Sequence, residues 1–464
     1  MTSMPGYTPI TAGIRARIAA IDGLTLIDAP EKLEEFGKDK TPGAFHRPEL
    51  VVEATEVLPI QALLRLANEC RFPVIPRGLG TGLAGGAIPV QGGVVLSLSR
   101  MNRIIAIEPR NMIAVVEPGV RNLDLKNAVA EYGLCYPPDP ASNDTCSIGG
   151  NAATNAGGPA CVKYGTTRDY ILGLEAVLPS GELVEAGVRT RKGVVGYDMT
   201  RLLVGSEGTL GVITKLIVRL IPRPADVTTC VALFPGLSSA MEAITTILMA
   251  GHMPSTLEFM DAKCLGLVKD LLPFAGVGEA GAMLLIESDG ATETIRREIA
   301  AVREICLAGG ASHALIAMDA EKRKQMWEVR RAISLRIEEA HPLDMQEDVV
   351  VPLGRIAEFV ECLPTYEAAC GVKIYSFGHS GDGNIHLSVT ADTLDAAEKA
   401  EAAVREIIKK VIAMGGTMSG EHGVGIAKQR FLPLELSPES IRLQRAIKLL
   451  FDPNLILNPG KMFA

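Results

Sequence analysis

Apolar and polar stretches alternate along the chain in a pattern that changes near residue 222. Before that point, short apolar runs between glycine turns predict strands at residues 49–54, 73–77 and 93–99, with a helix at 58–70. Further strands are predicted at 103–108 and 113–118. The stretch LGLEAVLPSGELVEA predicts a hairpin with Ser180-Gly181 at its tip. The first part is therefore expected to be rich in sheet.

The two prolines and the charged residues of LIPRPAD, residues 220–226, mark a predicted domain boundary. Beyond it, strands alternate with amphipathic helices, which predicts an α+β domain with an extended sheet. Two helices have clear apolar faces and end at glycine pairs. These faces comprise Ile295, Ile299, Val302 and Cys306 in one helix and Val404, Ile407, Ile408 and Val411 in the other.

Composition narrows the class of protein. The 464 residues carry a net charge of -8, which disfavours a nucleic-acid partner, and no apolar run reaches the roughly 18 residues of a membrane span. The start of the chain lacks the features of a signal peptide, so we expect a soluble, cytoplasmic protein. Nine scattered cysteines without a C-x-x-C motif indicate neither a disulfide framework nor an iron–sulfur cluster.

A glycine-rich stretch, PRGLGTGLAGGAIP at 76–89, matches the spacing of a dinucleotide-binding fingerprint. That fingerprint requires a helix to start at the last glycine, whereas here the chain runs into a predicted strand, so a Rossmann fold is rejected. A Walker loop is excluded because no Gly-Lys-Ser/Thr follows. Backbone N–H groups beside Arg77 could cradle a pyrophosphate, although spacing alone leaves an ordinary turn-rich loop equally open.

Two more segments, PPDPASNDTCSIGGNAATNAGGPACVKYGTTRD at 137–169 and GSEGTLGVIT at 205–214, change this balance. Together with the glycine loop they resemble the flavin-binding domain of the vanillyl-alcohol oxidase and p-cresol methylhydroxylase superfamily. The resemblance is strongest to its 2-hydroxy-acid branch, which includes D-lactate dehydrogenases, glycolate oxidase catalytic subunits and D-2-hydroxyglutarate dehydrogenases. It extends from about residue 45 to the final NPGK.

The resemblance implies an α+β protein with a two-subdomain FAD-binding domain, formed by residues 1–222 and completed by 427–464. Residues 223–426 would form an α+β cap domain with an antiparallel sheet that carries substrate and metal. The residues that it implies for FAD are Pro76, Arg77, Gly78, Gly80, Thr81, Gly82, Gly85, Gly86, Pro138, Ser142, Gly149, Gly150, Asn151, Thr154, Asn155, Gly165, Glu207, Gly208, Val212, Ile213 and Asn458.

Within this set, Glu207 and Gly208, with Val212 and Ile213, are expected at the adenosine end of FAD. A helix or turn cap is the alternative role of Glu207. Relatives that bind flavin covalently often have a histidine in the glycine loop, where this chain has Leu79 and Thr81. The flavin is therefore expected to be noncovalent.

Two of the seven histidines lie in the stretch GHSGDGNIHLS at 378–388. If Asp382-Gly383 forms a two-residue type I′ turn, His379 pairs directly with His386 across a hairpin. Their Cβ atoms would then lie about 5 Å apart on one face, close enough to share a metal ion. Histidines that merely cap a hairpin are the equally open alternative from the residues themselves.

The stretch SGEHGVG at 419–425 offers a third ligand and a base. The resemblance assigns His379, His386 and Glu421 to a divalent metal, either zinc or manganese, and favours His422 as the catalytic base. The alternative for His422 is a structural histidine. Asn384 is expected either to contact the substrate or to serve the turn.

A cation for a substrate carboxylate is predicted on the helix KQMWEVRRAISLRIEEA. Its apolar arc consists of Met326, Val329, Ile333 and Ile337; Arg330 falls within this arc and Arg331 points away. A buried arginine needs an anion, so Arg330 is the predicted substrate-binding residue, as the resemblance also implies.

Leu353 stands where many relatives carry an arginine, and Gln346 aligns with a lysine of the hydroxyglutarate enzymes. Both departures favour a monocarboxylic acid such as D-lactate or glycolate. The alternatives are a D-2-hydroxyglutarate dehydrogenase, an alkyl-dihydroxyacetonephosphate synthase-like transferase and a noncatalytic flavin-binding subunit. The electron acceptor is expected to be external: a quinone, an electron-transfer protein or an iron–sulfur partner subunit. A homodimer remains open.

Overall fold

The computed structural model describes residues 6–271, 280–317 and 320–463, and the chain divides into two compact units. The first unit contains residues 1–157, 166–223 and 421–464; the second contains residues 158–165 and 224–420. The α+β class, with antiparallel sheets, is confirmed. Within the described ranges, none of the helices combines the length and the apolar character needed to span a membrane.

The first unit begins with a four-stranded sheet in the order β1-β2-β4-β3. The strands are β1 (Leu24–Ile27), β2 (Leu50–Ala54), β3 (Val74–Arg77) and β4 (Val94–Ser97), and β2, β3 and β4 are mutually parallel. The three helices of this region are α1 (Ala12–Ala19), α2 (Pro30–Phe36) and α3 (Val57–Cys70).

Both faces of this sheet are covered, which explains why its strands read as continuous apolar runs. Val52, Val94 and Leu96 pack with residues of α1 and α3, including Ile18 and Leu63. On the opposite face, three other strand residues pack against α2. These are Val51, Ile75 and Val95, in contact with Leu33.

A five-stranded antiparallel sheet completes the first unit, in the order β5-β6-β10-β8-β9. Its strands are β5 (Ile104–Glu108), β6 (Ile113–Val116), β8 (Ile171–Val177), β9 (Leu183–Gly187) and β10 (Val212–Arg219), and a small pair joins β7 (Leu134–Cys135) to β11 (Ile221–Pro222). The helices are α4 (Asn122–Ala130), α5 (Ile148–Thr154), α7 (Met199–Leu203), α14 (Leu432–Glu435) and α15 (Pro438–Phe451). The predicted hairpin at Ser180-Gly181 is present between β8 and β9.

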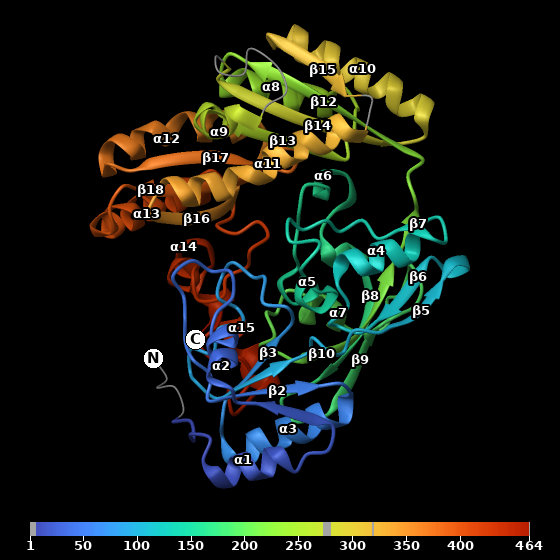
Figure 1. Ribbon diagram of the computed structural model, residues 1–464, viewed down its shortest axis with the longest axis vertical. Coiled ribbons are helices and arrows are strands. Elements are labelled where there is room, and N and C mark those ends of the chain that lie inside the picture. The colour runs from blue at the N-terminus through green and yellow to red at the C-terminus, as the bar shows by residue number, and fades with distance from the viewer. Residues whose placement is uncertain (1–5, 272–279, 318–319, 464) are drawn as a thin grey trace. The chain divides into compact units, whose positions relative to one another are not determined.

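The second unit is built on a seven-stranded antiparallel sheet in the order β15-β12-β14-β13-β17-β18-β16 (Figure 1). Its strands are β12 (Asp226–Phe234), β13 (Thr256–Asp261), β14 (Ala282–Gly290), β15 (His313–Ala317), β16 (Leu343–Val350), β17 (Lys373–His379) and β18 (Asn384–Ala391). Its helices are α6 (Cys161–Tyr164), α8 (Leu237–Met249), α9 (Ala262–Val268), α10 (Thr292–Ala308), α11 (Ala320–Ala340), α12 (Ile356–Cys370) and α13 (Ala397–Ala413).

Helix α11 packs on this sheet in the orientation that its periodicity predicts. Its four buried residues are Met326, Val329, Ile333 and Ile337, and they share a core with Tyr375 and Phe377 of β17. Arg331 is exposed, whereas the side chain of Arg330 is only 11% exposed. The helix therefore turns Arg330 toward the sheet.

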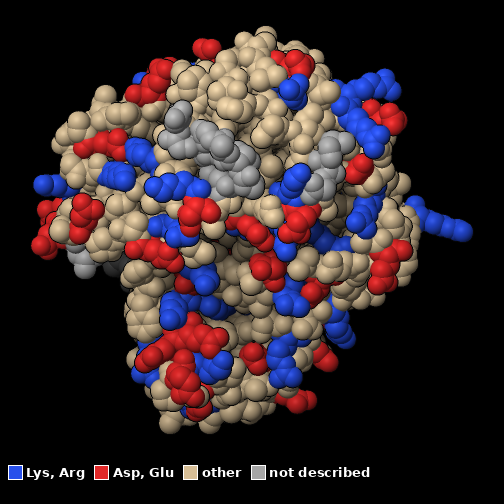
Figure 2. Space-filling view, turned by 45° about the horizontal axis from the view of Figure 1, so that its top comes forward, with Lys and Arg blue, Asp and Glu red and all other residues tan. Residues whose placement is uncertain are grey.

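Acidic and basic side chains are interspersed on the face of the molecule that Figure 2 displays. Ion pairs form within several helices and turns, for example between Lys32 and Glu35 and between Arg355 and Glu358. Pairs of this kind are exposed and contribute little to stability.

Candidate functional site

The glycine loop between β3 and β4 contains no helix, so the rejection of a Rossmann fold is confirmed. In residues 78–86, carbonyl groups take part in hydrogen bonds to described residues, whereas N–H groups do not. Carbonyl groups of Gly82, Ala84 and Gly85 accept bonds from backbone N–H groups of the protein. The N–H groups of residues 78–86, in contrast, donate to no residue that the structure describes. The loop thus presents a run of unused donors, as an anion-binding nest requires.

Arg77 lies directly against this loop and is 8% exposed. Its Nη1 donates to the carbonyl of Lys38 at 2.8 Å, and its guanidinium stacks 5.2 Å from the ring centroid of Phe36. Burial lowers the pKa of Arg77. Gly80 has a positive φ of 70°, and a Cβ atom there would collide with the guanidinium. The conformation of the loop therefore depends on a glycine over a buried cation.

The second glycine segment packs on the first. A Cβ atom at Gly78 would lie 2.6 Å from Oγ of Ser147, the N-cap residue of α5. The same Oγ accepts from the N–H of Gly150 at 3.2 Å. A side chain at Gly149 would collide with Pro118. Small residues are thus required where these two segments meet.

The third segment and the C-terminal tail join them through Glu207 and Asn458. The N–H of Glu207 donates to Ala153 in α5, and Nδ2 of Asn458 donates to the carbonyls of Gly86 and Glu207 at 3.0 and 2.7 Å. All the residues predicted for FAD therefore belong to the first unit except Gly165, which belongs to the second.

The residues present fit FAD by two observations. The unused N–H groups of the glycine loop match a pyrophosphate, which carries only acceptors. Oδ1 of Asn458 is buried and has no hydrogen-bond partner among the described residues, so it is suited to accept from an N–H or hydroxyl group of the cofactor.

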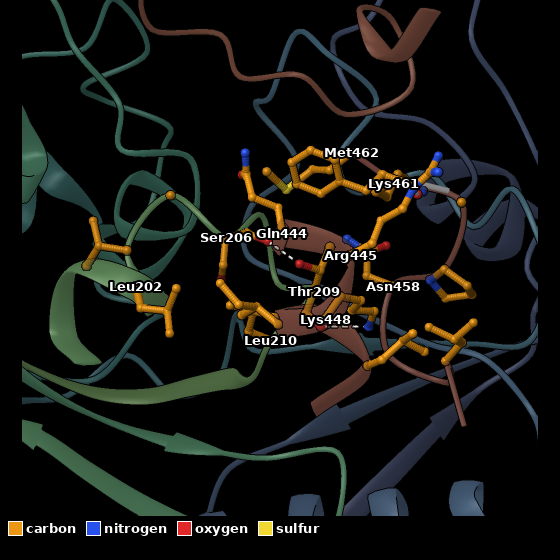
Figure 3. Close-up of a pocket in the computed structure, with 18 of the residues that line it drawn as sticks. Leu202, Ser206, Thr209, Leu210, Gln444, Arg445, Lys448, Asn458, Lys461 and Met462 are labelled. Atoms are coloured by element: carbon orange, nitrogen blue, oxygen red, sulfur yellow. Dashed lines mark hydrogen bonds between the residues drawn. The ribbon is translucent and has the colours of Figure 1, made fainter. Parts of the chain in front are cut away.

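A cavity of about 490 Å³ lies beside Asn458, between the third segment, α7, α15 and the tail (Figure 3). The described residues of its wall include five cationic side chains and no acidic ones. These are Arg168, Arg201, Arg445, Lys448 and Lys461. The tail, predicted to pack back on the body, therefore helps to form both the wall of this cavity and the contacts to Glu207.

His379 and His386 lie side by side in the second unit, with their Nε2 atoms 3.3 Å apart. The predicted pairing was wrong in register, because β18 places His386 opposite Phe377 rather than His379. The turn is two residues longer than a type I′ turn, since Ser380 and Gly381 bond to the carbonyl of Leu257. A shift of two residues keeps both histidines on the same face.

Their separation suits a shared ion. Two nitrogens bound to one tetrahedral zinc ion at the usual Zn–N distances are about 3.3 Å apart. Nδ1 of His379 is bonded to Oε1 of Glu258, so a neutral His379 would present a lone pair at Nε2. A carboxylate on the far nitrogen of a histidine is typical of metal ligands.

Carboxylates and a further histidine lie close by. Asp348, His386, Glu421 and His422 each offer a ligand atom, and these atoms lie within 4.8 Å of one another. Residues 417–420 run beside β16, where the N–H of Gly420 donates to Oδ2 of Asp348 at 2.9 Å. Glu421 and His422 are the next two residues of the chain. His379 is not part of this four-residue group, and Asp348 was not predicted.

Arg330 finds its anion inside the protein. Its Nε donates to Oε2 of Glu258 at 2.7 Å, and its guanidinium lies 4.7 Å from the ring centroid of Phe377. Burial would raise the pKa of Glu258, but the positive charges of His379 and Arg330 outweigh it and lower the pKa to about 2. Glu258 therefore holds a predicted metal ligand and the predicted substrate arginine.

Asn384 serves the fold. Its Nδ2 donates to Oδ1 of Asp348 at 2.6 Å and to the carbonyl of Val349 at 3.2 Å. Both donors of the side-chain amide are thus used within the sheet.

Sequence reasoning missed Glu258 and Asp348, and both carry the same signal. Each is an acidic residue with no exposed surface, within a strand and next to an apolar residue, Leu257 for Glu258 and Val349 for Asp348. A buried carboxylate requires a cation or hydrogen-bond donors, so such a position in a predicted core strand marks a polar site. Which residue supplies that cation or donor, however, depends on the order of the strands in the sheet.

Comparison with known proteins agrees with this arrangement. Residues 48–187 match the family described as FAD binding domain, and residues 223–462 match the family FAD linked oxidases, C-terminal domain. The chain is 39% identical to glycolate oxidase subunit GlcD of Bacillus subtilis, over 98% of this chain and 97% of that one. It is also 39% identical to D-lactate dehydrogenase of Anaerostipes hadrus, over 98% of both chains.

Solved structures show the same fold. p-Cresol methylhydroxylase with substrate bound superimposes with a TM-score of 0.81 at 18% identity, over 97% of this chain and 96% of that one. Alkyldihydroxyacetonephosphate synthase superimposes with a TM-score of 0.74 at 20% identity, over 99% and 86%. Given these matches over nearly its whole length, the chain belongs to the family of FAD-linked oxidases.

Proposed function

We propose that the protein oxidises a small 2-hydroxy acid, D-lactate or glycolate, to the 2-oxo acid and reduces bound FAD. The observation that carries this proposal is the group of His386, Asp348, Glu421 and His422 next to His379, in an FAD-linked oxidase. The relatives named glycolate oxidase subunit GlcD and D-lactate dehydrogenase support the substrate class.

FAD would accept the hydride from C2 of the substrate. The free N–H groups of residues 78–86 would hold its pyrophosphate, and Arg77 would stabilise that charge from below the loop. Asn458 would accept a hydrogen bond from the cofactor through its unpartnered Oδ1. The other residues predicted for FAD line the same segments and stay a proposal.

A divalent cation, zinc or manganese, would lower the pKa of the substrate hydroxyl group. His379, His386 and Glu421 would hold it, and the structure adds Asp348 as a further candidate ligand. Glu258 would keep His379 in the tautomer that has its lone pair at Nε2. The mixture of nitrogen and oxygen donors suits both metals.

His422 would remove the hydroxyl proton. Its ring nitrogen lies within the group of potential ligands, so it would be within reach of a hydroxyl group held there. Because C2 loses a hydride as the hydroxyl oxygen loses a proton, the two losses together give the 2-oxo acid.

Arg330 would bind the substrate carboxylate with the part of its guanidinium that Glu258 leaves free. Of the three guanidinium nitrogens, Nε is bonded to Glu258, and the two terminal nitrogens have no hydrogen bond to any residue that the structure describes, so they could make a bidentate contact. The ion pair would thus orient the arginine rather than neutralise its function.

A short, monocarboxylic substrate is favoured by the next polar residues on the same sheet face. Gln346 donates to Asp344 at 3.1 Å, and Ser388 donates to the same carboxylate at 3.4 Å. The second carboxylate of 2-hydroxyglutarate would therefore approach a carboxylate instead of a cation. Electrons would leave the flavin to an external acceptor: a quinone, an electron-transfer protein or an iron–sulfur partner subunit.

The test is a His379→Ala, His386→Ala double variant, assayed with D-lactate and glycolate and an artificial acceptor, beside metal analysis of the same samples. We expect loss of the bound metal and at least a 100-fold fall in kcat/KM, with FAD content unchanged. A matched His313→Ala variant, an exposed histidine on β15, should behave like the wild type. Normal turnover in the double variant would exclude a metal-assisted mechanism.

A further inference from the structure

Glu207 has a backbone conformation that residues other than glycine rarely adopt, with φ at 52°, and it is 7% exposed. Such a conformation costs about 1 kcal/mol or more and persists only where the surroundings impose it. Three polar groups of this residue impose it. Its N–H donates to Ala153, its carbonyl accepts from Asn458, and its carboxylate accepts from two further N–H groups.

Those two donors belong to the loop that carries Glu421 and His422. The N–H of Val424 donates to Oε1 of Glu207 at 2.7 Å, and the N–H of Gly425 donates to Oε2 at 2.8 Å. Gly425 has φ at 48°, and a Cβ atom there would collide with the carbonyl of Ala84. Each carboxylate oxygen is thus committed to one residue of this loop.

The same loop is bonded to the glycine loop and to the tail. The N–H of Ile426 donates to the carbonyl of Ala84 at 2.8 Å, and the N–H of Met462 donates to the carbonyl of Gly425 at 3.0 Å. A Cβ atom at Gly85 would collide with the side chain of Ile426. The residues just after His422 therefore rest on the segments predicted to hold FAD.

A carboxylate suits this position because each of its two oxygens accepts one of the two N–H bonds. Burial raises the pKa of Glu207, and the two N–H donors and the buried cation Lys461 oppose that effect. Hydrogen bonds from N–H groups to a carboxylate are about twice as strong as those to a neutral acceptor. Glutamine could accept only one of the two bonds, because its NH₂ group would face the other donor.

We propose that Glu207 is a positioning residue that connects the segments predicted to hold FAD with His422, rather than a ligand of the adenosine of FAD. The bonds from Val424 and Gly425 to Glu207 fix the position of the chain just after His422. The bonds of Glu207 with Ala153 and Asn458 fix Glu207 itself to the segments predicted to hold FAD. The proposal concerns catalysis and so rests on the proposed function. The hydrogen bonds that it invokes can also be tested without activity.

The main experiment compares wild type, Glu207→Gln and Thr209→Val as FAD-loaded proteins. Thr209 is a matched control, since it is buried in the same segment and, among the described residues, its hydroxyl group bonds to the carbonyl of Ser206 alone. Rapid mixing with D-lactate or glycolate under anaerobic conditions gives the rate of flavin reduction. For Glu207→Gln we expect that rate to fall by about 10- to 100-fold, as for a misplaced catalytic group. FAD affinity should change less than about threefold, and Thr209→Val should match the wild type.

Hydrogen exchange measured by mass spectrometry on a peptide covering residues 420–430 tests the contact itself. In wild type the N–H groups of Val424 and Gly425 should exchange slowly, and in Glu207→Gln the peptide should lose at least tenfold protection. Glu207→Asp keeps the charge but is one methylene shorter, so an intermediate loss of both protection and rate is expected. This variant serves if Glu207→Gln does not fold.

The outcomes separate the two proposals. Unchanged protection in Glu207→Gln, or an unchanged reduction rate, overturns the positioning role. A fall in FAD affinity, with a wild-type rate once FAD is saturating, also overturns it and returns Glu207 to cofactor binding. If wild type itself shows no reduction by any 2-hydroxy acid while the exchange result holds, the proposed function fails and the contact stands.

Discussion

Glu258 connects two residues that the sequence presents as independent candidates. It lies opposite His379 in the pairing of β13 with β17, and it receives Arg330 from α11. A carboxylate without exposed surface is stable there because Arg330 supplies a positive charge and the ring of His379 a hydrogen bond. The metal site and the substrate arginine are thus expected to fail together when this one side chain is changed.

Replacing Glu258 by glutamine tests this expectation. The variant leaves Arg330 buried without a counter-charge, so we expect a loss of about 3 kcal/mol in the free energy of unfolding. Metal affinity should fall by about 10- to 100-fold because His379 loses its orienting partner. Urea unfolding and metal titration measure both. Glu328→Gln, on the exposed face of α11, is the control and should change stability by less than about 0.5 kcal/mol.

The buried Lys461 is expected to make the free energy of unfolding depend on pH. Burial lowers its pKa to about 8, below the value of about 10.4 in an unfolded chain. Between these values the unfolded state binds more protons, so this residue makes the protein more stable as pH rises from about 8 to 10. The difference in unfolding free energy between wild type and Lys461→Met should therefore shift toward wild type by about 1–3 kcal/mol over that range. An equal difference at pH 7.5 and 9.5 would contradict this assignment.

At the scale of elements, helix faces could be predicted from the sequence but turn registers could not. The apolar arc of α11 follows from a period of 3.6 residues, and all four predicted residues are buried. The hairpin of β17 and β18 was predicted with a turn that is too short. Its length depends on bonds from Ser380 and Gly381 to Leu257, which is more than a hundred residues away in the sequence.

The same limit applies to the partners of buried charges. That Arg330 needs an anion is readable from its helix face, but that the anion is Glu258 follows from β13 lying beside β17. Likewise Asp348 meets His386 because β16 pairs with β18. Strand order is a property of the whole sheet, so local patterns do not contain it.

A further prediction concerns Gly383, in the turn between β17 and β18. It has φ at 87°, and a Cβ atom there would collide with the carbonyl of Val351. Gly371 also has a positive φ, 66°, but a Cβ atom there would meet nothing within 4 Å. Both alanine variants should lose about 1 kcal/mol from backbone strain.

The collision should cost Gly383→Ala at least about 2 kcal/mol more than Gly371→Ala, as overpacking does elsewhere. It should also weaken metal binding, since the turn sets the positions of His379 and His386. Urea unfolding and metal titration of the two variants provide the measurement. Equal losses in both would show that the turn tolerates a side chain.

At the scale of the whole molecule, the division into units does not follow the chain in order. Residues 158–165 belong to the second unit although their neighbours belong to the first. Within that unit, Lys163 donates to the carbonyl of Asp289 at 2.7 Å and Tyr164 donates to its carboxylate at 2.7 Å. Sequence patterns could not predict this excursion, because Asp289 lies at the end of a strand 125 residues further on.

The two units also divide the candidate chemistry. The residues predicted for FAD, apart from Gly165, lie in the first unit, and the sheet with His379, His386 and Asp348 lies in the second. Glu421 and His422 follow directly after Gly420, the last residue of the second unit. The central claim is that the chain oxidises a 2-hydroxy acid with bound FAD.

Anaerobic flavin reduction tests this claim most directly. The FAD- and metal-loaded protein would be mixed with D-lactate, L-lactate, glycolate and 2-hydroxyglutarate while absorbance near 450 nm is followed. We predict rapid bleaching by D-lactate or glycolate. The second-order rate constant for flavin reduction should be at least about 100-fold above that for 2-hydroxyglutarate. His422→Asn should bind FAD normally and bleach at least about 100-fold more slowly. A fully loaded protein whose flavin stays oxidised with all four acids would contradict the proposed function.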